Sequence, residues 1–314
     1  MKAILATRVG GPEVLELQDV PDPQPGPGEV RVRVEAAGVN FADTLMTRGL
    51  YPGGPQPPFV PGFEFAGVVE ETNEKVIGFG AGTRAYAQRI CVPRASLLPW
   101  PERLSAAEAA AFLVNYCTAY FAYWMADAKE NERVLIHAAA GGVGTAAIEL
   151  GRLFGVETFG TASSDDKLAR LRELGLDHGI NYKTSDYEKA VMELTSGEGV
   201  DIVFEMLGGA DTRKSARCLR SLGRLIIYGL ASGKLPEFDF MAMFERNASV
   251  HALWLTPLFQ DPEHIRQAWG EMQPWLAEGK LRPIVGHQLP LAQAAEAHRL
   301  LIERKNFGKI VLLP

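Results

Sequence analysis

A glycine-rich segment, HAAAGGVG at residues 137–144, directly follows the apolar run RVLI. Where a buried strand ends in glycines and a helix begins, backbone N–H groups and the positive end of the helix dipole can bind a pyrophosphate. Gly141 would let the backbone approach the phosphates, and Gly144 would let the helix expected over 142–154 pack closely on the strand. Ala139 replaces the usual first glycine. The segment predicts a dinucleotide site, with a purely structural strand-to-helix turn as the alternative.

The residues after the next expected strand, 156–162, bear on which dinucleotide is bound. NAD enzymes place an acidic side chain at this strand end for the ribose hydroxyls. Here the strand is followed by Ser163 and Ser164, with Lys167 about one helical turn further on. Tyr182 comes after the following strand. Small polar groups with a cation suit a ribose 2′-phosphate, so we expect NADPH.

Two acidic residues argue for NAD instead, because Asp165 and Asp166 fall near the spacing of the NAD carboxylate. We assign both to the first turn of a helix over 165–174, where carboxylates interact favourably with the helix dipole. The phosphate site has alternatives as well. Ser164 could be a helix N-cap, and Lys167 could be a solvated helix residue.

Short apolar strands alternate with helices through this half of the chain. Strands are expected at 133–136, 156–162, 178–181, 200–206, 223–229 and 249–255, with helices at 142–154 and 165–174. This alternation predicts an α/β fold with a doubly wound parallel sheet of the Rossmann type. Such a sheet binds its ligand at the carboxyl ends of its strands.

The first hundred residues differ, because loops rich in proline and glycine separate short strands. These strands are expected within 1–11 and at 14–20, 29–36, 65–70 and 84–92. After the parallel sheet we expect helices at 262–278 and 291–304 and a last strand at 309–313. We therefore predict a mainly β domain at residues 1–117, the cofactor domain at 118–255 and a return to the β domain at 256–314. The substrate cleft is expected between the two halves.

Composition excludes several classes of protein. The net charge of −6 gives no general attraction for nucleic acid or anionic lipid. Cys91, Cys117 and Cys218 lie far apart without a CxxC pair, which excludes a cysteine-rich zinc lobe and indicates a reducing compartment. The N-terminus has no signal-peptide pattern, so a cytoplasmic location is expected. Polar residues interrupt the nearly uncharged stretch 109–126, which is expected to be a buried helix and not a membrane span.

Several ordered motifs resemble one known family along essentially the whole chain. They are AAGVNFADTLMTRGLYP at 36–52, PFVPGFEFAGVV at 58–69, the glycine segment, FGTAS at 159–163 and the ending KNFGKIVLLP. Together they resemble the zinc-independent, zeta-crystallin-like quinone oxidoreductases of the medium-chain dehydrogenase/reductase superfamily. VNYCTAY at 114–120 and VDIVFEMLGG at 200–209 are especially similar to the vesicle amine transport protein-like branch. The resemblance implies that the β domain is a GroES-like catalytic domain. One departure is the missing Pro-Gly-Asp-Arg turn, replaced by a short link at 71–75.

Zinc-dependent relatives of similar layout use two cysteines and a histidine as metal ligands. The matching positions here are Asn40, Phe63 and Val114, none of which offers a thiolate or an imidazole. Glu64 beside Phe63 is interpreted as structural. The resemblance therefore implies chemistry without a metal.

The resemblance also implies the catalytic residues. Residues matching Asn40 and Tyr51 line the cleft near the nicotinamide, and Asp43 is a third candidate. Each has a structural alternative: Asn40 and Asp43 could order a turn, and Tyr51 could be loop packing. A nearby tyrosine of the family is Leu45 in this chain.

Cofactor contacts are implied in the same way. Residues matching Ser163, Lys167 and Tyr182 surround the 2′-phosphate, and Thr118 with the turn Gly229, Leu230 and Ala231 covers the cofactor. The remaining implied contacts are Asn40, Ala140, Gly141, Gly142, Val143, Gly144, Leu207, Asn306 and Phe307. His137 is interpreted as a structural histidine.

The expected activity is an NADPH-dependent, zinc-independent reduction of quinones or related conjugated carbonyls. Positioning and hydrogen bonds to the developing oxyanion would supply most of the rate. The first alternative is an enone or enoyl-thioester reductase of the same superfamily. A cofactor-loaded protein that binds RNA or acts in membrane trafficking is a different class, and the acidic balance disfavours RNA. Relatives usually dimerise, so a homodimer is expected.

Overall fold

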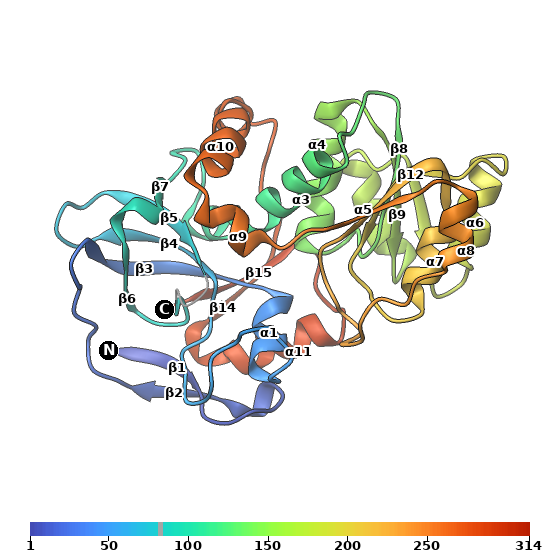
Figure 1. The fold of residues 1–314 in the computed structure, drawn as a ribbon. Coiled ribbons are helices and arrows are strands. Elements are labelled where there is room, and N and C mark those ends of the chain that lie inside the picture. Colours follow the sequence, from blue (N-terminus) through green and yellow to red (C-terminus); the bar gives the residue numbers. More distant parts are fainter. Residues whose placement is uncertain (81–83) are drawn as a thin grey trace. The chain divides into compact units, whose positions relative to one another are not determined.

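A computed structural model describes residues 1–80 and 84–314. The described chain forms two compact units (Figure 1). The β unit comprises residues 1–114 and 259–314, and the α/β unit comprises residues 115–258. The predicted fold class is confirmed, because one sheet is parallel and of the Rossmann type and the other belongs to a separate, mainly β unit. The domain limits expected at residues 117 and 255 stay a prediction.

The α/β unit is built on a six-stranded sheet in which every strand pair is parallel. The strand order is β10-β9-β8-β11-β12-β13. The strands are β8 (Arg133–Ile136), β9 (Glu157–Ala162), β10 (His178–Asn181), β11 (Val200–Glu205), β12 (Leu219–Ile227) and β13 (Ser249–Ala252). Numbered along the chain, this is the 3-2-1-4-5-6 order of the Rossmann fold. Its winding reverses between β8 and β11, which is where such sheets bind ligands.

Helices cover the strands of this sheet. They are α3 (Leu113–Met125), α4 (Gly142–Phe154), α5 (Asp165–Glu173), α6 (Tyr187–Leu194), α7 (Asp211–Arg217) and α8 (Phe240–Glu245). Among them, α4 and α5 contact β9, α6 contacts β10, and α7 contacts β11 and β12. The central strands are apolar runs because they are buried on both faces, as Val134, Leu135 and Ile136 of β8 show.

The β unit contains a larger sheet with the order β14-β15-β3-β4-β5-β7, in which β6 also pairs with β3. Its strands are β3 (Glu29–Val39), β4 (Glu64–Val69), β5 (Lys75–Phe79), β6 (Arg89–Pro93), β7 (Leu97–Pro99), β14 (Val285–Pro290) and β15 (Lys309–Leu313). β1 (Lys2–Ala6) and β2 (Leu15–Asp19) form a separate hairpin. β14 and β15 are parallel, and the other neighbours are antiparallel.

The helices of the β unit are short apart from one. They are α1 (Phe41–Thr47), α2 (Ala106–Ala110), α10 (Pro262–Ala277) and α11 (Ala294–Ile302), with α9 (Leu255–Gln260) leading in from the preceding unit. Single 3-10 turns lie at Pro12–Val14, Arg94–Ser96 and Leu291–Gln293. The core beneath the sheet is aliphatic and aromatic, and includes Val32, Phe65 and Ile310.

Several predicted elements differ from the structure. The strand expected at 84–92 begins only at Arg89, because Arg84 has a φ of 57° and residues 85 and 86 donate their N–H groups to Gly62 and Pro61. The helix expected at 291–304 is a 3-10 turn followed by α11. The strand expected at 223–229 begins earlier, at Leu219, after a register shift in its pairing with β11.

Residues 109–126, which we expected to be one buried helix, include the end of α2 and all of α3. Most of their side chains are buried, as expected. None of the helices in the described part of the chain combines the length and the apolar character that crossing a bilayer requires.

Candidate active site

The predicted phosphate loop lies between the end of β8 and the start of α4. The N-cap of α4 is Gly141, which has no side chain to cap the helix, and the first N–H groups of a helix have no acceptor within it. A Cβ atom at Gly144 would come within 2.5 Å of the Ala139 backbone, and one at Gly142 within 2.4 Å of the Asn115 side chain. These residues therefore fit a pyrophosphate: the N-cap residue offers no side chain to the first amides of α4, and the backbone of Ala139 leaves no room for a side chain at Gly144.

The other predicted cofactor residues of the α/β unit follow successive strands. Ser163 comes directly after β9, Tyr182 after β10 and Leu207 shortly after β11, and Gly229, Leu230 and Ala231 lie just beyond β12. Because parallel strands end at one edge of their sheet, these residues share the carboxyl edge with the phosphate loop. Ala140 and Val143 belong to the loop itself, and Thr118 is a buried residue of α3.

Three basic residues lie around α5: Lys167 near its start, Arg170 in its last turn and Lys183 beyond β10. Lys167 is half-buried, and burial together with the neighbouring charges of Lys183 and Arg170 lowers its pKa. Mutual repulsion of three cations is relieved when an anion binds among them. The cluster therefore suits a phosphate group.

The acidic residues near this cluster are placed as predicted. Ser164 is the N-cap of α5, and its hydroxyl accepts a hydrogen bond from the Lys167 N–H at 3.4 Å. Asp165 and Asp166 form the first turn. Asp165 also accepts a 3.0 Å hydrogen bond from the Asn181 side chain. That carboxylate is therefore engaged within the protein.

His137 lies in a buried polar network behind the phosphate loop. Its Nε2 is 2.9 Å from the Ser215 hydroxyl and its Nδ1 is 3.2 Å from the Thr161 hydroxyl. Burial lowers the pKa of the imidazole, which favours the neutral ring. Ser215 donates to Glu205, whose other carboxylate oxygen accepts from the backbone N–H groups of Leu207 and Gly208 at 2.6 and 2.9 Å. The network holds the loop after β11 in place.

In the β unit, Asn40 is the N-cap of α1. Its backbone N–H donates to Asp43 Oδ2 at 2.8 Å, and the Tyr86 hydroxyl donates to the same oxygen at 3.0 Å. Asp43 has no exposed surface, and burial raises its pKa to about 7. The turn suggested for Asn40 and Asp43 is thus the start of a helix. Asp43 fixes the backbone of Asn40 by accepting a hydrogen bond from its N–H.

The Asn40 side chain is part of a second buried network. Its Oδ1 accepts from Lys309 Nζ at 2.6 Å, and its Nδ2 donates to Glu64 Oε1 at 3.0 Å and to the Gly38 carbonyl at 3.4 Å. Lys309 also forms an ion pair with Glu64, whose Oε2 accepts from the Val114 N–H at 2.9 Å. Sequence reasoning missed Lys309. The signal available for it was a lysine in the otherwise apolar run KIVLL.

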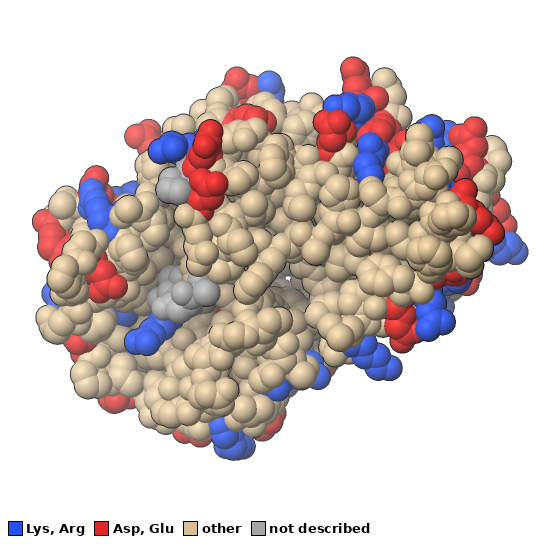
Figure 2. Space-filling model, viewed as in Figure 1, with Lys and Arg blue, Asp and Glu red and all other residues tan. Residues whose placement is uncertain are grey.

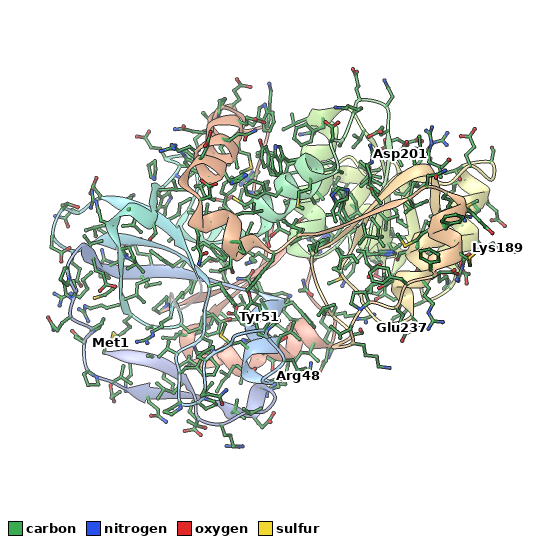
Figure 3. All side chains as sticks on the ribbon, viewed as in Figure 1. Met1, Arg48, Tyr51, Lys189, Asp201 and Glu237 are labelled. Atoms are coloured by element: carbon green, nitrogen blue, oxygen red, sulfur yellow. The ribbon has the colours of Figure 1, made fainter. Side chains whose placement is uncertain are left out.

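Tyr51 lies in the segment that follows α1, three residues beyond Arg48 (Figure 3). Its half-buried ring is tilted against Phe63, with 5.3 Å between the ring centroids. Phe63 in turn stacks on Phe79 at 6.0 Å. Tyr51 therefore belongs to an aromatic row. Asn306 and Phe307, the remaining predicted contacts, are buried just before β15, where the Asn306 amide donates to the Gly308 carbonyl at 3.0 Å.

Two family models match this chain. Residues 26–104 match the alcohol dehydrogenase GroES-like domain, and residues 174–312 match the zinc-binding dehydrogenase model. The quinone oxidoreductase from Thermus thermophilus, which was also crystallised with NADPH, is 38% identical over the full length of both chains, with a TM-score of 0.89. The chain belongs to the quinone oxidoreductase family of the medium-chain dehydrogenase/reductase superfamily. The predicted resemblance is confirmed.

Relatives with other names are also similar to this chain over nearly its whole length. The synaptic vesicle membrane protein VAT-1 homolog of Rattus norvegicus is 35% identical, and the alignment covers 100% of this chain and 84% of the relative. The 2-haloacrylate reductase of a Burkholderia species is 34% identical over 99% of this chain and 98% of its own length.

One family model is named for zinc, so the possible ligand positions matter. The positions that match the metal ligands of zinc-dependent relatives hold Asn40, Phe63 and Val114. Glu64 accepts hydrogen bonds from two of these residues, from the Asn40 side chain and from the Val114 N–H. In residues 1–80 and 84–314, no group of three or more His, Cys, Asp or Glu side chains gathers closely enough to hold a metal ion.

Proposed function

We propose that this protein is an NADPH-dependent, zinc-independent reductase of quinones or related conjugated carbonyls. The observation that carries the proposal is the carboxyl edge of the parallel sheet. There the N-terminus of α4, whose N-cap residue Gly141 has no side chain, follows β8, and the predicted cofactor residues follow β9, β10, β11 and β12. The Thermus thermophilus relative of known structure binds NADPH, which supports the same cofactor here.

Selection of NADPH over NADH is assigned to α5 and the strand ends beside it. Lys167, Arg170 and Lys183 supply positive charge, and Ser163 with Tyr182 supplies hydroxyl groups at the adjoining strand ends. A ribose 2′-phosphate can accept charge-assisted hydrogen bonds from such groups, whereas a ribose hydroxyl gains little from the cations.

A bound reduced nicotinamide would supply a hydride. Asn40 is proposed as a hydrogen-bond donor to the oxyanion of the reduced substrate, because its second amide N–H makes only a long 3.4 Å contact with the Gly38 carbonyl. Tyr51 is proposed as the proton donor, directly or through a water molecule. Asp43 acts through Asn40, whose backbone it holds.

No step in this proposal requires a metal ion. The positions that match zinc ligands hold an amide, a phenyl ring and an isopropyl group, and none of these is a zinc ligand. Hydrogen-bond donors would take the place of a Lewis acid at the oxyanion.

Reduction of a conjugated C=C bond is the second candidate. It is favoured by the similarity to 2-haloacrylate reductase, which extends over nearly the whole of both chains. The same donors would serve, because hydride addition to an enone or an enoyl thioester also leaves an enolate oxygen to stabilise.

A screen of NADPH oxidation against quinones, enones, enoyl thioesters and 2-haloacrylates tests these candidates. Turnover of a quinone supports the first proposal. Turnover confined to C=C acceptors supports the second, and no turnover with any acceptor contradicts both. Filter binding with single-stranded RNA at physiological salt tests the alternative that the protein binds RNA. We expect no retention, since on the face drawn in Figure 2 acidic and basic side chains are interspersed.

Assembly and location complete the proposal. We infer a homodimer, because β13 ends the described sheet and nearby Trp254 and Leu222 are exposed. The cytoplasm is the proposed location, since Cys91 and Cys218 are free thiols and a reducing compartment keeps them so.

A further inference from the structure

Lys309 is a charged residue in the interior of the β unit. It is the first residue of β15, and the antiparallel pairing of Ile310 with Val39 sets it opposite Asn40. The pairing of Gly38 with Glu64 brings the carboxylate to the same place from β4. Lys309 and Glu64 are 3% and 1% exposed, respectively. Three strands therefore bring an ammonium, a carboxylate and an amide together.

The surroundings of this network are shaped to hold it. A Cβ atom at Gly38 would lie 2.7 Å from Glu64 Oε1 and 2.4 Å from the Ala110 carbonyl, so only glycine leaves room for the carboxylate. Both oxygens of Glu64 are engaged, one with Lys309 and Asn40 and the other with the Val114 N–H. Burying an ion pair costs desolvation free energy, which this pair offsets through additional hydrogen bonds.

We propose that Lys309 is a positioning residue of the reduction: its ammonium, held by Glu64, orients and polarises the Asn40 amide so that the amide N–H donates to the substrate oxyanion. The inference rests on the proposed role of Asn40 as that donor. Lys309 is not among the site residues that the resemblance implies. The proposed role gives a physical reason for a lysine buried at this position.

Two effects follow from the contact between Lys309 Nζ and Asn40 Oδ1 at 2.6 Å. The amide cannot rotate by half a turn, because its NH₂ group would then face the ammonium, so the direction of the donor is fixed. A cation on the carbonyl oxygen also draws electron density from the nitrogen. The N–H becomes a stronger donor, as in other cooperative hydrogen-bond chains.

The direct test is a double-mutant cycle of Asn40→Ala and Lys309→Met, with kcat measured on the best acceptor at saturating NADPH. We expect Asn40→Ala to lower kcat about a hundredfold, as loss of one oxyanion donor typically does. Lys309→Met should lower kcat about tenfold, in keeping with a charge-assisted hydrogen bond. The double variant should be no slower than Asn40→Ala alone. A double variant slower by about a further tenfold would overturn the inference, because Lys309 would then act independently of Asn40.

Folding must be separated from positioning, because Lys309→Met leaves Glu64 buried without its cation. The variant Glu64→Gln/Lys309→Met removes both charges and should have a higher thermal midpoint than Lys309→Met alone. Its kcat should stay low. Recovery of the unmutated kcat together with stability would overturn the inference, since the pair would then be only structural. Lys309→Arg keeps a cation and should retain most of the activity.

A binding measurement provides a readout without turnover. With NADPH bound, Lys309→Met should weaken binding of a phenolate, which mimics the product oxyanion, about tenfold. Binding of the matching methyl ether should not change. Equal phenolate affinity in both proteins would overturn the inference. An unmutated protein that reduces no acceptor would overturn the proposed function as well, whereas independent losses in an active enzyme would overturn the role of Lys309 alone.

Discussion

Lys167 lies near the start of α5, where burial and the charges of Lys183 and Arg170 lower its pKa. A bound 2′-phosphate would neutralise part of this charge. We therefore predict that NADPH binds at least about tenfold more tightly than NADH, since charge-assisted hydrogen bonds exceed the roughly 1.4 kcal/mol that a factor of ten requires. Lys167→Ala should remove most of this preference, as measured by fluorescence titration with both cofactors.

Lys189 offers a matched control for that titration. It is an exposed lysine of α6, paired at 3.7 Å with Glu193 one turn further along the helix (Figure 3). Lys189→Ala should leave both dissociation constants unchanged. Equal affinity of the unmutated protein for NADPH and NADH would contradict the assignment of the 2′-phosphate site.

Tyr51 can be tested by comparing two kinds of acceptor. Hydride addition to a quinone yields a stabilised phenolate that water can protonate, whereas addition to an enone yields a more basic enolate that benefits from a positioned acid. If Tyr51 donates the proton, Tyr51→Phe should lower kcat on an enone about a hundredfold and on a quinone much less. The ring contact with Phe63 is retained in this variant. Equal small losses on both acceptors would mean that the ring only shapes the site.

The residues that the sequence could and could not identify differ in how they come together. Gly141, Gly144 and Ser164 act through local geometry, so a short motif was enough to predict their positions in the loop and the helix cap. Lys309 reaches Asn40 through the pairing of β15 with β3, across 269 positions of sequence. No local pattern contains that pairing.

The same distinction holds for whole elements. The bounds of α4, β10 and β15 agree with prediction, because apolar runs ending in glycine or turn residues mark them locally. The short helix α1 was expected only as a possible turn, since its cap depends on the buried partners of Asp43. β6 begins late because its neighbours in space, Gly62 and Pro61, take up the preceding N–H groups.

The phosphate loop as an element can be tested at Gly144. Gly144→Ala places a methyl group within 2.5 Å of the Ala139 backbone, so the loop must shift. We predict at least about a tenfold loss of NADPH affinity, the size of one lost charge-assisted hydrogen bond. Gly270→Ala in α10 is the control, because its Cβ would lie in open space and alanine favours helix. An unchanged NADPH affinity in Gly144→Ala would count against the loop as the pyrophosphate site.

The start of α1 should make stability depend on pH. Burial raises the pKa of Asp43 from 3.8 to about 7, so between these values the folded protein holds a proton that the unfolded chain has released. The contribution of Asp43 to stability is therefore largest below pH 4 and falls as the pH rises towards 7. Across that window it should fall by about 4 kcal/mol.

Asp43→Asn isolates this effect, because the amide oxygen can still accept from Asn40 N–H. The free energy of unfolding of this variant, measured by urea titration relative to the unmutated protein, should rise between pH 4 and pH 7. A difference that stays constant with pH would show that Asp43 does not titrate in this window. A difference that falls between pH 4 and pH 7 would contradict a raised pKa of Asp43 in the folded protein.

At the scale of the whole molecule, the proposed functions divide between the two units. The α/β unit holds the predicted cofactor residues at one sheet edge, and the β unit holds Asn40, Tyr51 and the buried pair of Lys309 and Glu64. The positions that match zinc ligands belong to the β unit, where the Asn40 side chain accepts a hydrogen bond from Lys309. Because these positions hold no zinc ligand, the proposed reaction is hydride transfer from NADPH without a metal.

The most direct test measures NADPH oxidation by protein that has been dialysed against a strong chelator and shown by elemental analysis to carry well under one zinc per chain. Because Asn40, Phe63 and Val114 provide no zinc ligand, we predict that this protein reduces a quinone or a conjugated carbonyl at the rate of the untreated protein. It should use NADPH in preference to NADH. Loss of activity on chelation that added zinc restores would contradict the proposal, as would a complete absence of NADPH oxidation with every acceptor.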